Sequence, residues 1–329
     1  MTESMAAPQA RGKKYRDAIF GASNAAQADI QANGRDKVVN GTAGVIQDET
    51  GTLVCLPTVE KTYRALPMTE IIAYAPVAGL PAFLKDAQEC CFGDYRPEGY
   101  TAAVATTGGT GAIHHIIHNY TCPGDEVLTA DWYWSAYQML CADAGRSLRT
   151  FRLIGEDGGF DHEDFQRQLS AMADRQEQLV VVLNTPAHNP TGYSLTDEDW
   201  DRIFDFLKTL VARGRKITVL VDVSYIDYAG PGARAFFRKF SGLPPEILIV
   251  TAFSMSKSFT MYGVRVGAMI GLSSSEAVAR EFAEVNTYTS RATWSNNCRG
   301  GMACLVRIWE DPVLRRQYQA EQEQYYQLI

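Results

Sequence analysis

The sequence predicts an α/β fold in which helices cover both faces of a mostly parallel sheet. The apolar, β-branched runs 179–184, 216–223 and 247–253 are typical of strands that are buried on both faces. Segments with helical spacing separate these runs, as the crossover connections of parallel strands require. Because such sheets bind ligands beyond the carboxyl ends of their strands, polar residues that follow the strands are candidates for a functional site.

The first half of the chain contains three of the expected strands. Helical character over 14–32 precedes a turn at QDETG (47–51), and helical spacing resumes from Pro57 to Tyr74. The expected strands are 102–106, 126–130 and 147–153. The expected helices around them are 80–93, 109–120, 135–144 and 161–173.

The second half continues the same alternation and ends in helices. The expected strands are 179–184, 216–223, 247–253 and 267–273. A helix over 196–213 begins at Thr196, where TDED predicts a capping box. Further helices are expected near 275–285 and over 299–329. The last segment has apolar or aromatic side chains at helical spacing, which predicts one long helix.

Composition excludes several functional classes. The 329 residues carry a net charge of −7, which argues against nucleic-acid binding because phosphate contacts need a basic surface. No run approaches the roughly 18 apolar residues of a membrane span, and no apolar segment follows the basic residues at the start, so no secretory signal is expected. Seven scattered cysteines without metal spacing predict reduced thiols, no metal site and a cytoplasmic protein.

Two of the four polar clusters that follow strands carry an anion-binding or turn signature. TTGGTGA (106–112) joins a strand to a helix, so its glycines and free N–H groups favour phosphate binding, although such a turn is more often purely structural. NTPAHNPTG (184–192) places Asn189 in a Pro-Thr-Gly turn, and ordinary turn chemistry is the simpler interpretation of that motif alone.

The other two clusters contain charged residues beside buried runs. VDVSYIDY (221–228) puts Asp222 inside an apolar strand, where a carboxylate is costly unless it meets a cation or serves a function. TAFSMSKSFTMYGVRVG (251–267) surrounds Lys257 with serines and ends in Arg265. Taken together, the clusters offer a phosphate site, a carboxylate for a pyridine nitrogen and a lysine for an aldehyde. These are the groups that pyridoxal 5′-phosphate needs.

From about Asp17 to its end, the chain resembles the class I aminotransferases of the pyridoxal-phosphate fold type I, in the aspartate and aromatic aminotransferase branch. YAPVAGLPAF, GGTGA, HNPTG, SMSKSFTMYGVRVG and SRATWSNN carry the resemblance. It implies that Lys257, Asp222 and Tyr225 are catalytic. It also implies a set of cofactor-binding residues: Gly108, Gly109, Thr110, Tyr133, Asn189, Asp222, Tyr225, Ser254, Ser256, Lys257, Arg265 and Tyr74.

The resemblance also implies a homodimer with shared sites. Tyr74 matches the tyrosine that reaches the phosphate of the neighbouring subunit, and Arg291 matches the arginine that reaches the substrate's side chain across the interface. Gly44 is a second substrate-binding candidate, in the N-terminal segment. Tyr133 is chosen from DWYW as the residue that stacks on the pyridine ring.

Three regions follow from the resemblance. They are an N-terminal arm with part of a small domain (1–52), a large cofactor-binding domain (53–298) and the start of the C-terminal small domain (299–329). Because related chains continue well past the position of Ile329, we expect a fragment or a short relative with an incomplete small domain. The family's arginine for the substrate α-carboxylate lies in the part that is missing here.

The expected reaction moves an amino group between an amino acid, of aspartate or aromatic type, and a 2-oxo acid. Two other functions stay open. One is a lyase or decarboxylase, since the same fold and cofactor support other bond cleavages. The other is a chain that binds the cofactor without turnover. The residues do not decide between dicarboxylic and aromatic amino acids.

Overall fold

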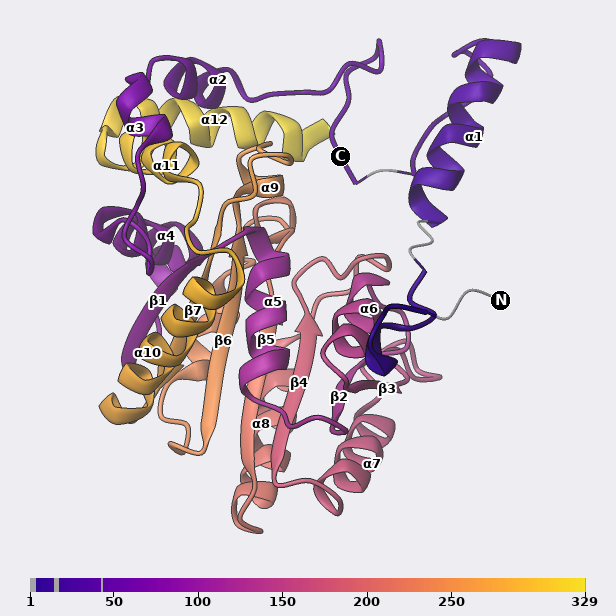
Figure 1. Cartoon of the computed structure of the whole chain (residues 1–329), viewed down its shortest axis with the longest axis vertical. Coiled ribbons are helices and arrows are strands. Elements are labelled where there is room, and N and C mark those ends of the chain that lie inside the picture. The colour runs from indigo at the N-terminus through magenta and orange to yellow at the C-terminus, as the bar shows by residue number, and fades with distance from the viewer. Residues whose placement is uncertain (1–3, 15–17, 43, 329) are drawn as a thin grey trace. The chain divides into compact units, whose positions relative to one another are not determined.

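The computed structural model describes residues 4–14, 18–42 and 44–328, which divide into two compact units, Met1–Val54 and Cys55–Ile329 (Figure 1). The first unit contains a short 3-10 helix, η1 (Pro8–Ala10), and helix α1 (Ala18–Asn33). In its predicted turn, Gln47 bridges to Leu53, and the Asp48 carboxylate accepts hydrogen bonds from the Thr50 and Thr52 backbones. The turn at 47–51 is therefore confirmed.

A seven-stranded sheet organises the second unit. Its order is β1-β7-β6-β5-β4-β2-β3. Strand β7 runs antiparallel to β6 and β1, whereas β6, β5, β4, β2 and β3 pair in parallel, so the predicted mostly parallel sheet is confirmed. The strand bounds are β1 (Tyr100–Thr106), β2 (Glu126–Ala130), β3 (Ser147–Phe151), β4 (Gln178–Asn184), β5 (Lys216–Asp222), β6 (Ile247–Ser254) and β7 (Gly267–Ser273).

Helices cover both faces of this sheet. Successive side chains of β4 enter two different cores, because neighbouring residues of a strand point to opposite faces: Val180 and Val182 join one core, and Val181 and Leu183 join the other. The helices are α2 (Pro57–Arg64), α3 (Met68–Ile72), α4 (Pro81–Phe92), α5 (Gly108–Asn119), α6 (Ala136–Asp143), α7 (His162–Ala173), α8 (Asp197–Val211), α9 (Met255–Ser258), α10 (Glu276–Thr293), α11 (Arg299–Glu310) and α12 (Pro312–Leu328). Short 3-10 helices are η2 (Gly93–Tyr95), η3 (Ile226–Tyr228) and η4 (Ala235–Phe240).

The two cores contain different helices. Helices α5, α6 and α10 contribute side chains such as Ile113, Tyr137 and Phe282 to the core on one face, and Figure 1 shows α5 and α10 in front of the sheet. Helices α4, α7, α8 and α11 fill the core on the other face. Among the described helices, none combines the length and apolar character that crossing a membrane requires.

The predicted capping box of α8 is confirmed. The Thr196 hydroxyl accepts a hydrogen bond from the Asp199 N–H at 3.1 Å, and the Asp199 carboxylate accepts one from the Thr196 N–H at 2.9 Å. These reciprocal bonds satisfy two amides at the helix start. The helix buries an apolar stripe that includes Trp200, Ile203 and Leu207.

The prediction of one long helix over 299–329 is wrong. Helix α11 ends at Glu310 and α12 begins at Pro312, with Asp311 in an extended conformation between them. Proline has no N–H for the helix and disfavours the helical conformation in the preceding residue. The Asp311 carboxylate caps the new helix by accepting from the Val313 N–H at 2.8 Å.

A second predicted helical segment, 57–74, is also interrupted at a proline. Helix α2 ends at Arg64, and Pro67 precedes α3. Both helices pack against α11, so residues 299–310 lie within the second unit. The predicted boundaries of an arm, a large domain and a small domain stay predictions.

Candidate active site

Polar residues gather at the carboxyl edge of the sheet, as the sequence predicts. Asn184, Asp222 and Ser254 are the last residues of the adjacent strands β4, β5 and β6. Lys257 follows β6 in the single turn of α9. Helix α5 begins at Gly108, close to this turn. The Arg265 side chain shows the proximity, since it contacts both Thr110 in the first turn of α5 and Ser256.

Arg265 joins the start of α5 to the serine turn. Its Nη1 donates to Ser256 Oγ at 3.0 Å, and its Nη2 lies 3.4 Å from Thr110 Oγ1. Gly108 has a φ of +69°, and a Cβ there would lie 2.7 Å from Arg265 Nη2, so this position needs glycine. Burial lowers the pKa of the Arg265 guanidinium below its ordinary value. The guanidinium, two hydroxyls and the helix start together form an anion cradle.

The Asp222 carboxylate is held by donors on both oxygens. Its side chain is buried, and Oδ2 accepts a 2.6 Å hydrogen bond from the Tyr137 hydroxyl. Oδ1 accepts from the Ser224 hydroxyl at 2.6 Å and from the Ser224 N–H at 3.2 Å. Burial, and then the charge of Asp222, raise the pKa of Tyr137 well above its ordinary value, so this phenol remains a donor. These contacts fix the carboxylate's orientation.

Asn189 is tied to the same strand end through Asn184. The Asn184 amide donates to the Asp222 backbone carbonyl at 2.8 Å, and its Oδ1 accepts from the Asn189 N–H at 2.6 Å. Because Asn184 and Asp222 are direct partners in the parallel β4–β5 pair, the HNPTG turn is fixed beside the carboxylate.

The Lys257 ammonium group lies among aromatic rings. Its Nζ is 5.7 Å from the centroid of the Tyr225 ring and 5.2 Å from that of Tyr262. Burial lowers the pKa of Lys257, the positive charge of Arg265 lowers it further, and Asp222 opposes the shift. The neutral, nucleophilic amine is therefore easier to form than on a free lysine. Burial also raises the pKa of the Tyr225 phenol.

Sequence reasoning missed several members of this site, including Tyr137, Ser224, Asn184 and Tyr262. Ser224 and Asn184 had a local signal, because one follows Asp222 by two positions and the other ends a buried strand. Tyr137 had none, since its contact with Asp222 spans 85 residues. A pattern in one stretch of sequence does not report such a contact.

The aromatic residues of DWYW take different positions. The Tyr133 hydroxyl donates to Gln138 at 3.2 Å. The Trp134 ring instead packs edge-on against Tyr137, with centroids 5.7 Å apart, and so contacts the partner of Asp222. The stacking role of Tyr133 stays a prediction, and Trp134 is the alternative that this geometry favours.

Two predicted residues of the second unit do not join the cluster within this chain. Tyr74 is 89% exposed, and Arg291, in the last turn of α10, is exposed and donates to Ser295. Gly44 belongs to the first unit, and its substrate-binding role stays a prediction. The predicted roles of Tyr74 and Arg291 at a neighbouring subunit's site are untested by a single chain.

The donor set fits pyridoxal 5′-phosphate. The anion cradle suits its phosphate, and the clamped Asp222 carboxylate suits a protonated pyridine nitrogen. The Lys257 amine, with its lowered pKa, suits an aldehyde. A sheet of this topology with these groups at its carboxyl edge defines a pyridoxal-phosphate enzyme of fold type I.

The comparisons with known proteins agree with this class. The sequence model of the family described as "Aminotransferase class I and II" matches residues 36–327, and the chain belongs to this family. A solved aminotransferase from Anaerococcus prevotii is 35% identical, with a TM-score of 0.96 over 99% of this chain and 80% of its own.

Two further relatives indicate the branch and the cofactor. An aromatic-amino-acid aminotransferase from Paracoccus denitrificans is 29% identical over 91% of this chain and 75% of its own length, and aspartate aminotransferases also match. A solved aromatic-amino-acid aminotransferase from Burkholderia pseudomallei, described as covalently bound to pyridoxal phosphate, is 25% identical. Its TM-score is 0.78, over 97% of this chain and 78% of its own.

Proposed function

We propose that this aminotransferase exchanges amino groups between an aspartate-type or aromatic amino acid and a 2-oxo acid, with Lys257 as both the cofactor-binding lysine and the proton carrier. The single observation that carries the proposal is the position of Lys257. Its amine has a lowered pKa, lies beside the rings of Tyr225 and Tyr262, and shares the sheet edge with Asp222. The family and its relatives support the amino-transfer reaction.

Three groups of residues would hold pyridoxal 5′-phosphate. The phosphate is assigned to the start of α5 and to the hydroxyls and guanidinium of the anion cradle: Gly108, Gly109, Thr110, Ser254, Ser256 and Arg265. Asp222 is assigned to the pyridine nitrogen, and Asn189 and Tyr225 to the ring oxygen. Tyr74 of a neighbouring subunit is assigned to the phosphate.

The bound cofactor supplies a conjugated ring that accepts the electron pair left when the substrate's Cα–H bond breaks. Asp222 keeps the pyridine nitrogen protonated, and Tyr137 and Ser224 hold that carboxylate in place. Lys257 Nζ would accept the proton from the substrate's Cα and would deliver it to the cofactor carbon next to the substrate nitrogen, so no net proton would be consumed. The anion cradle keeps the cofactor fixed while Lys257 moves.

A substrate panel tests the function. Purified enzyme with pyridoxal 5′-phosphate is given aspartate, phenylalanine and tyrosine, each with 2-oxoglutarate, and glutamate formation is measured. Glutamate should appear in a one-to-one ratio with the new 2-oxo acid. A lyase or decarboxylase would form product without 2-oxoglutarate, and a non-catalytic chain would bind the cofactor without either product. Both outcomes would reject the proposed reaction.

Lys257→Ala is the matching variant. It should lose turnover by about 10⁴-fold, because both the covalent link and the proton carrier disappear. Borohydride reduction followed by peptide mass spectrometry should label Lys257 in the wild type and no lysine in the variant. A labelled lysine in the folded variant would show that the cofactor-binding residue lies elsewhere.

We also propose a homodimer with shared sites, in which Tyr74 and Arg291 serve the partner subunit. Exposure of Tyr74 and Arg291 supports this arrangement, and two-fold dimers are the commonest oligomers. Mixing Lys257→Ala and Arg291→Ala chains should restore activity toward aspartate, since one hybrid site carries neither defect. Mixed dimers without any rescue would count against shared sites.

The finer substrate and location assignments are also part of the proposal. Gly44 and Arg291 are assigned to the substrate, and the protein is assigned to the cytoplasm. All seven cysteines are free thiols, which supports a reducing compartment. Cell fractionation with antibody detection tests the location, and enrichment outside the cytoplasmic fraction would reject it.

A further inference from the structure

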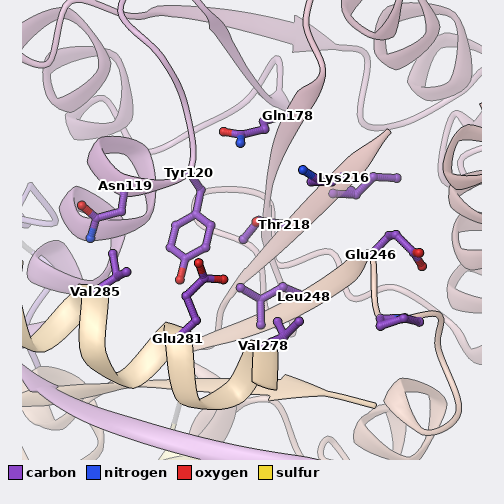
Figure 2. A pocket seen from close by; sticks show the side chains of 12 residues that line it. Asn119, Tyr120, Gln178, Lys216, Thr218, Glu246, Leu248, Val278, Glu281 and Val285 are labelled. Carbon is purple, nitrogen blue, oxygen red and sulfur yellow. The ribbon is translucent and has the colours of Figure 1, made fainter. Parts of the chain in front are cut away.

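A pocket opens at the amino-terminal edge of the sheet, opposite the edge that carries the candidate active site. It has a volume of about 450 Å³, which lies within the range of small-molecule sites. Its walls come from the first residues of β4, β5 and β6, from the end of α5 and from α10 (Figure 2). The proposed catalytic groups lie at the other ends of the same strands, so this pocket is separate from them.

The floor of the pocket is apolar apart from one hydroxyl. Leu248 and Thr218 are 5% and 6% exposed, and Figure 2 shows both side chains at the pocket. Within the described parts of the chain, the Thr218 hydroxyl makes no hydrogen bond, and it is not among the fully buried atoms that lack a partner, so it is open to the pocket. The base of the pocket therefore combines an apolar surface with one hydroxyl that water or a bound molecule can reach.

One wall of the pocket is a face of α10. Val278, Glu281 and Val285 are spaced three and four residues apart, so they share one side of the helix. Tyr120, just after the end of α5, forms the opposing wall. Figure 2 shows the Glu281 carboxylate extending toward the Tyr120 hydroxyl. The wall thus combines an apolar surface with one carboxylate.

The charges around the pocket favour a cation. Glu281 and Glu246 have no ion-pair partner among the residues that the structure describes, whereas Lys216 is already paired with Glu177 at 3.2 Å. Helix α5 ends here, and the carbonyl end of a helix carries partial negative charge. Burial raises the pKa of Tyr120 to about 12; a hydrogen bond from the Asn286 amide opposes this rise, and the charge of Glu281 adds to it. The neutral phenol accepts that bond at 3.2 Å and keeps its own O–H to donate.

We propose that this pocket binds a small amphiphilic cation, namely an ammonium group on an aromatic or branched apolar body. The ammonium lies between Glu281 and Tyr120, and the apolar body packs on Leu248, Val278 and Val285. This site is independent of the proposed reaction and of its cofactor.

The test uses N,N-dimethyl-2-phenylethylamine as the probe. Its protonated tertiary amine supplies one N–H donor and cannot condense with the aldehyde of the cofactor. Calorimetric titration of the holoenzyme should show saturable binding that weakens as salt is raised. Its neutral counterpart, 2-phenylethanol, and its anionic counterpart, 3-phenylpropanoate, should bind at least about threefold more weakly, because they lack the ion pair. The visible spectrum of the cofactor should not change.

Three variants test whether the probe binds in this pocket. Glu281→Gln should weaken the binding of the probe about threefold to fivefold, since it removes the carboxylate charge but keeps the shape of the side chain. Val278→Trp should abolish binding by filling the cavity, with folding checked by circular dichroism. Glu284→Gln, a neutralisation on the same helix outside the pocket lining, should bind like the wild type. The proposal is overturned if Glu284→Gln weakens binding as much as Glu281→Gln, if Val278→Trp still binds, or if wild type shows no saturable binding.

Discussion

The two edges of the sheet differ in charge and in how firmly their polar groups are held. The carboxyl edge carries Lys257, Arg265 and the N–H end of α5 beside the Asp222 carboxylate. The amino-terminal edge carries Glu246, Glu281 and the carbonyl end of the same helix, and its Lys216 is paired with Glu177. Because parallel strands and their helices all have a direction, one sheet offers an anion site at one edge and a cation site at the other.

The hydrogen bonds at the two edges differ as much as the charges. The Asp222 carboxylate is buried and accepts three hydrogen bonds, whereas the Glu281 and Glu246 carboxylates are exposed. A substitution at the carboxyl edge therefore removes a contact that water cannot replace. At the amino-terminal edge, water can replace most of what is lost. Substitutions at the two edges should differ accordingly in their effect on rate.

After the loss expected for Lys257→Ala, the largest effect is expected at Asp222. Asp222→Asn should retain the cofactor through the anion cradle but lower kcat by several orders of magnitude, because a neutral amide no longer keeps the pyridine nitrogen protonated. Steady-state kinetics with the best amino acid of the panel measures this, and the cofactor's absorbance confirms occupancy. A loss of less than about tenfold, or 1.4 kcal/mol, would mean that the carboxylate is only structural.

An intermediate effect is expected for the two hydroxyls that hold Asp222. Tyr137→Phe should lower kcat about tenfold, the cost of removing one hydrogen bond to a charged group. Ser224→Ala should cost less, because the Ser224 N–H still donates to the same oxygen. The pH dependence of the bound cofactor's absorbance should also shift in Tyr137→Phe, which a purely structural role would not produce. Equal losses in both variants would contradict the predicted order.

A smaller effect concerns the pH dependence of Lys257. In cofactor-free protein, labelling of Lys257 by trinitrobenzenesulfonate should reach half its maximal rate below pH 10.5, the value for a free lysine, because burial and Arg265 lower the pKa. Asp222 opposes this shift, so Asp222→Asn should move the midpoint lower still. Peptide mapping across a pH series measures both midpoints. A midpoint that rises in Asp222→Asn would contradict the assigned electrostatics.

The smallest effect is expected at the amino-terminal edge. Lys216→Met removes an exposed ion pair with Glu177, and such pairs contribute about 0–1 kcal/mol to stability. Chemical denaturation should show a change within that range, and kcat should stay unchanged within error. A large loss of activity would show that the two edges are coupled, and that the contrast between them is incomplete.

The sequence predicted the position of those groups whose place in the fold depends on chain position alone. Lys257, Asp222 and Asn189 each end or follow a buried strand, and the fold brings strand ends together. Tyr137 could not be found in this way, because its contact with Asp222 depends on where α6 packs beside the sheet. Pro312 is a local signal for a break between two helices. Apolar side chains at helical spacing on both sides of this proline nevertheless favoured the prediction of one continuous helix.

The pairing of Asn184 with Asp222 has a consequence for how this enzyme can change over evolution. The two residues are partners in the β4–β5 register, so the separation of the HNPTG turn from the carboxylate is set by the sheet. A single inserted residue within either strand would reverse the facing of every side chain beyond it. Insertions in the connecting loops leave that separation intact. We therefore expect related chains to vary in length in the connections and to keep a constant residue count in the strands that carry the site.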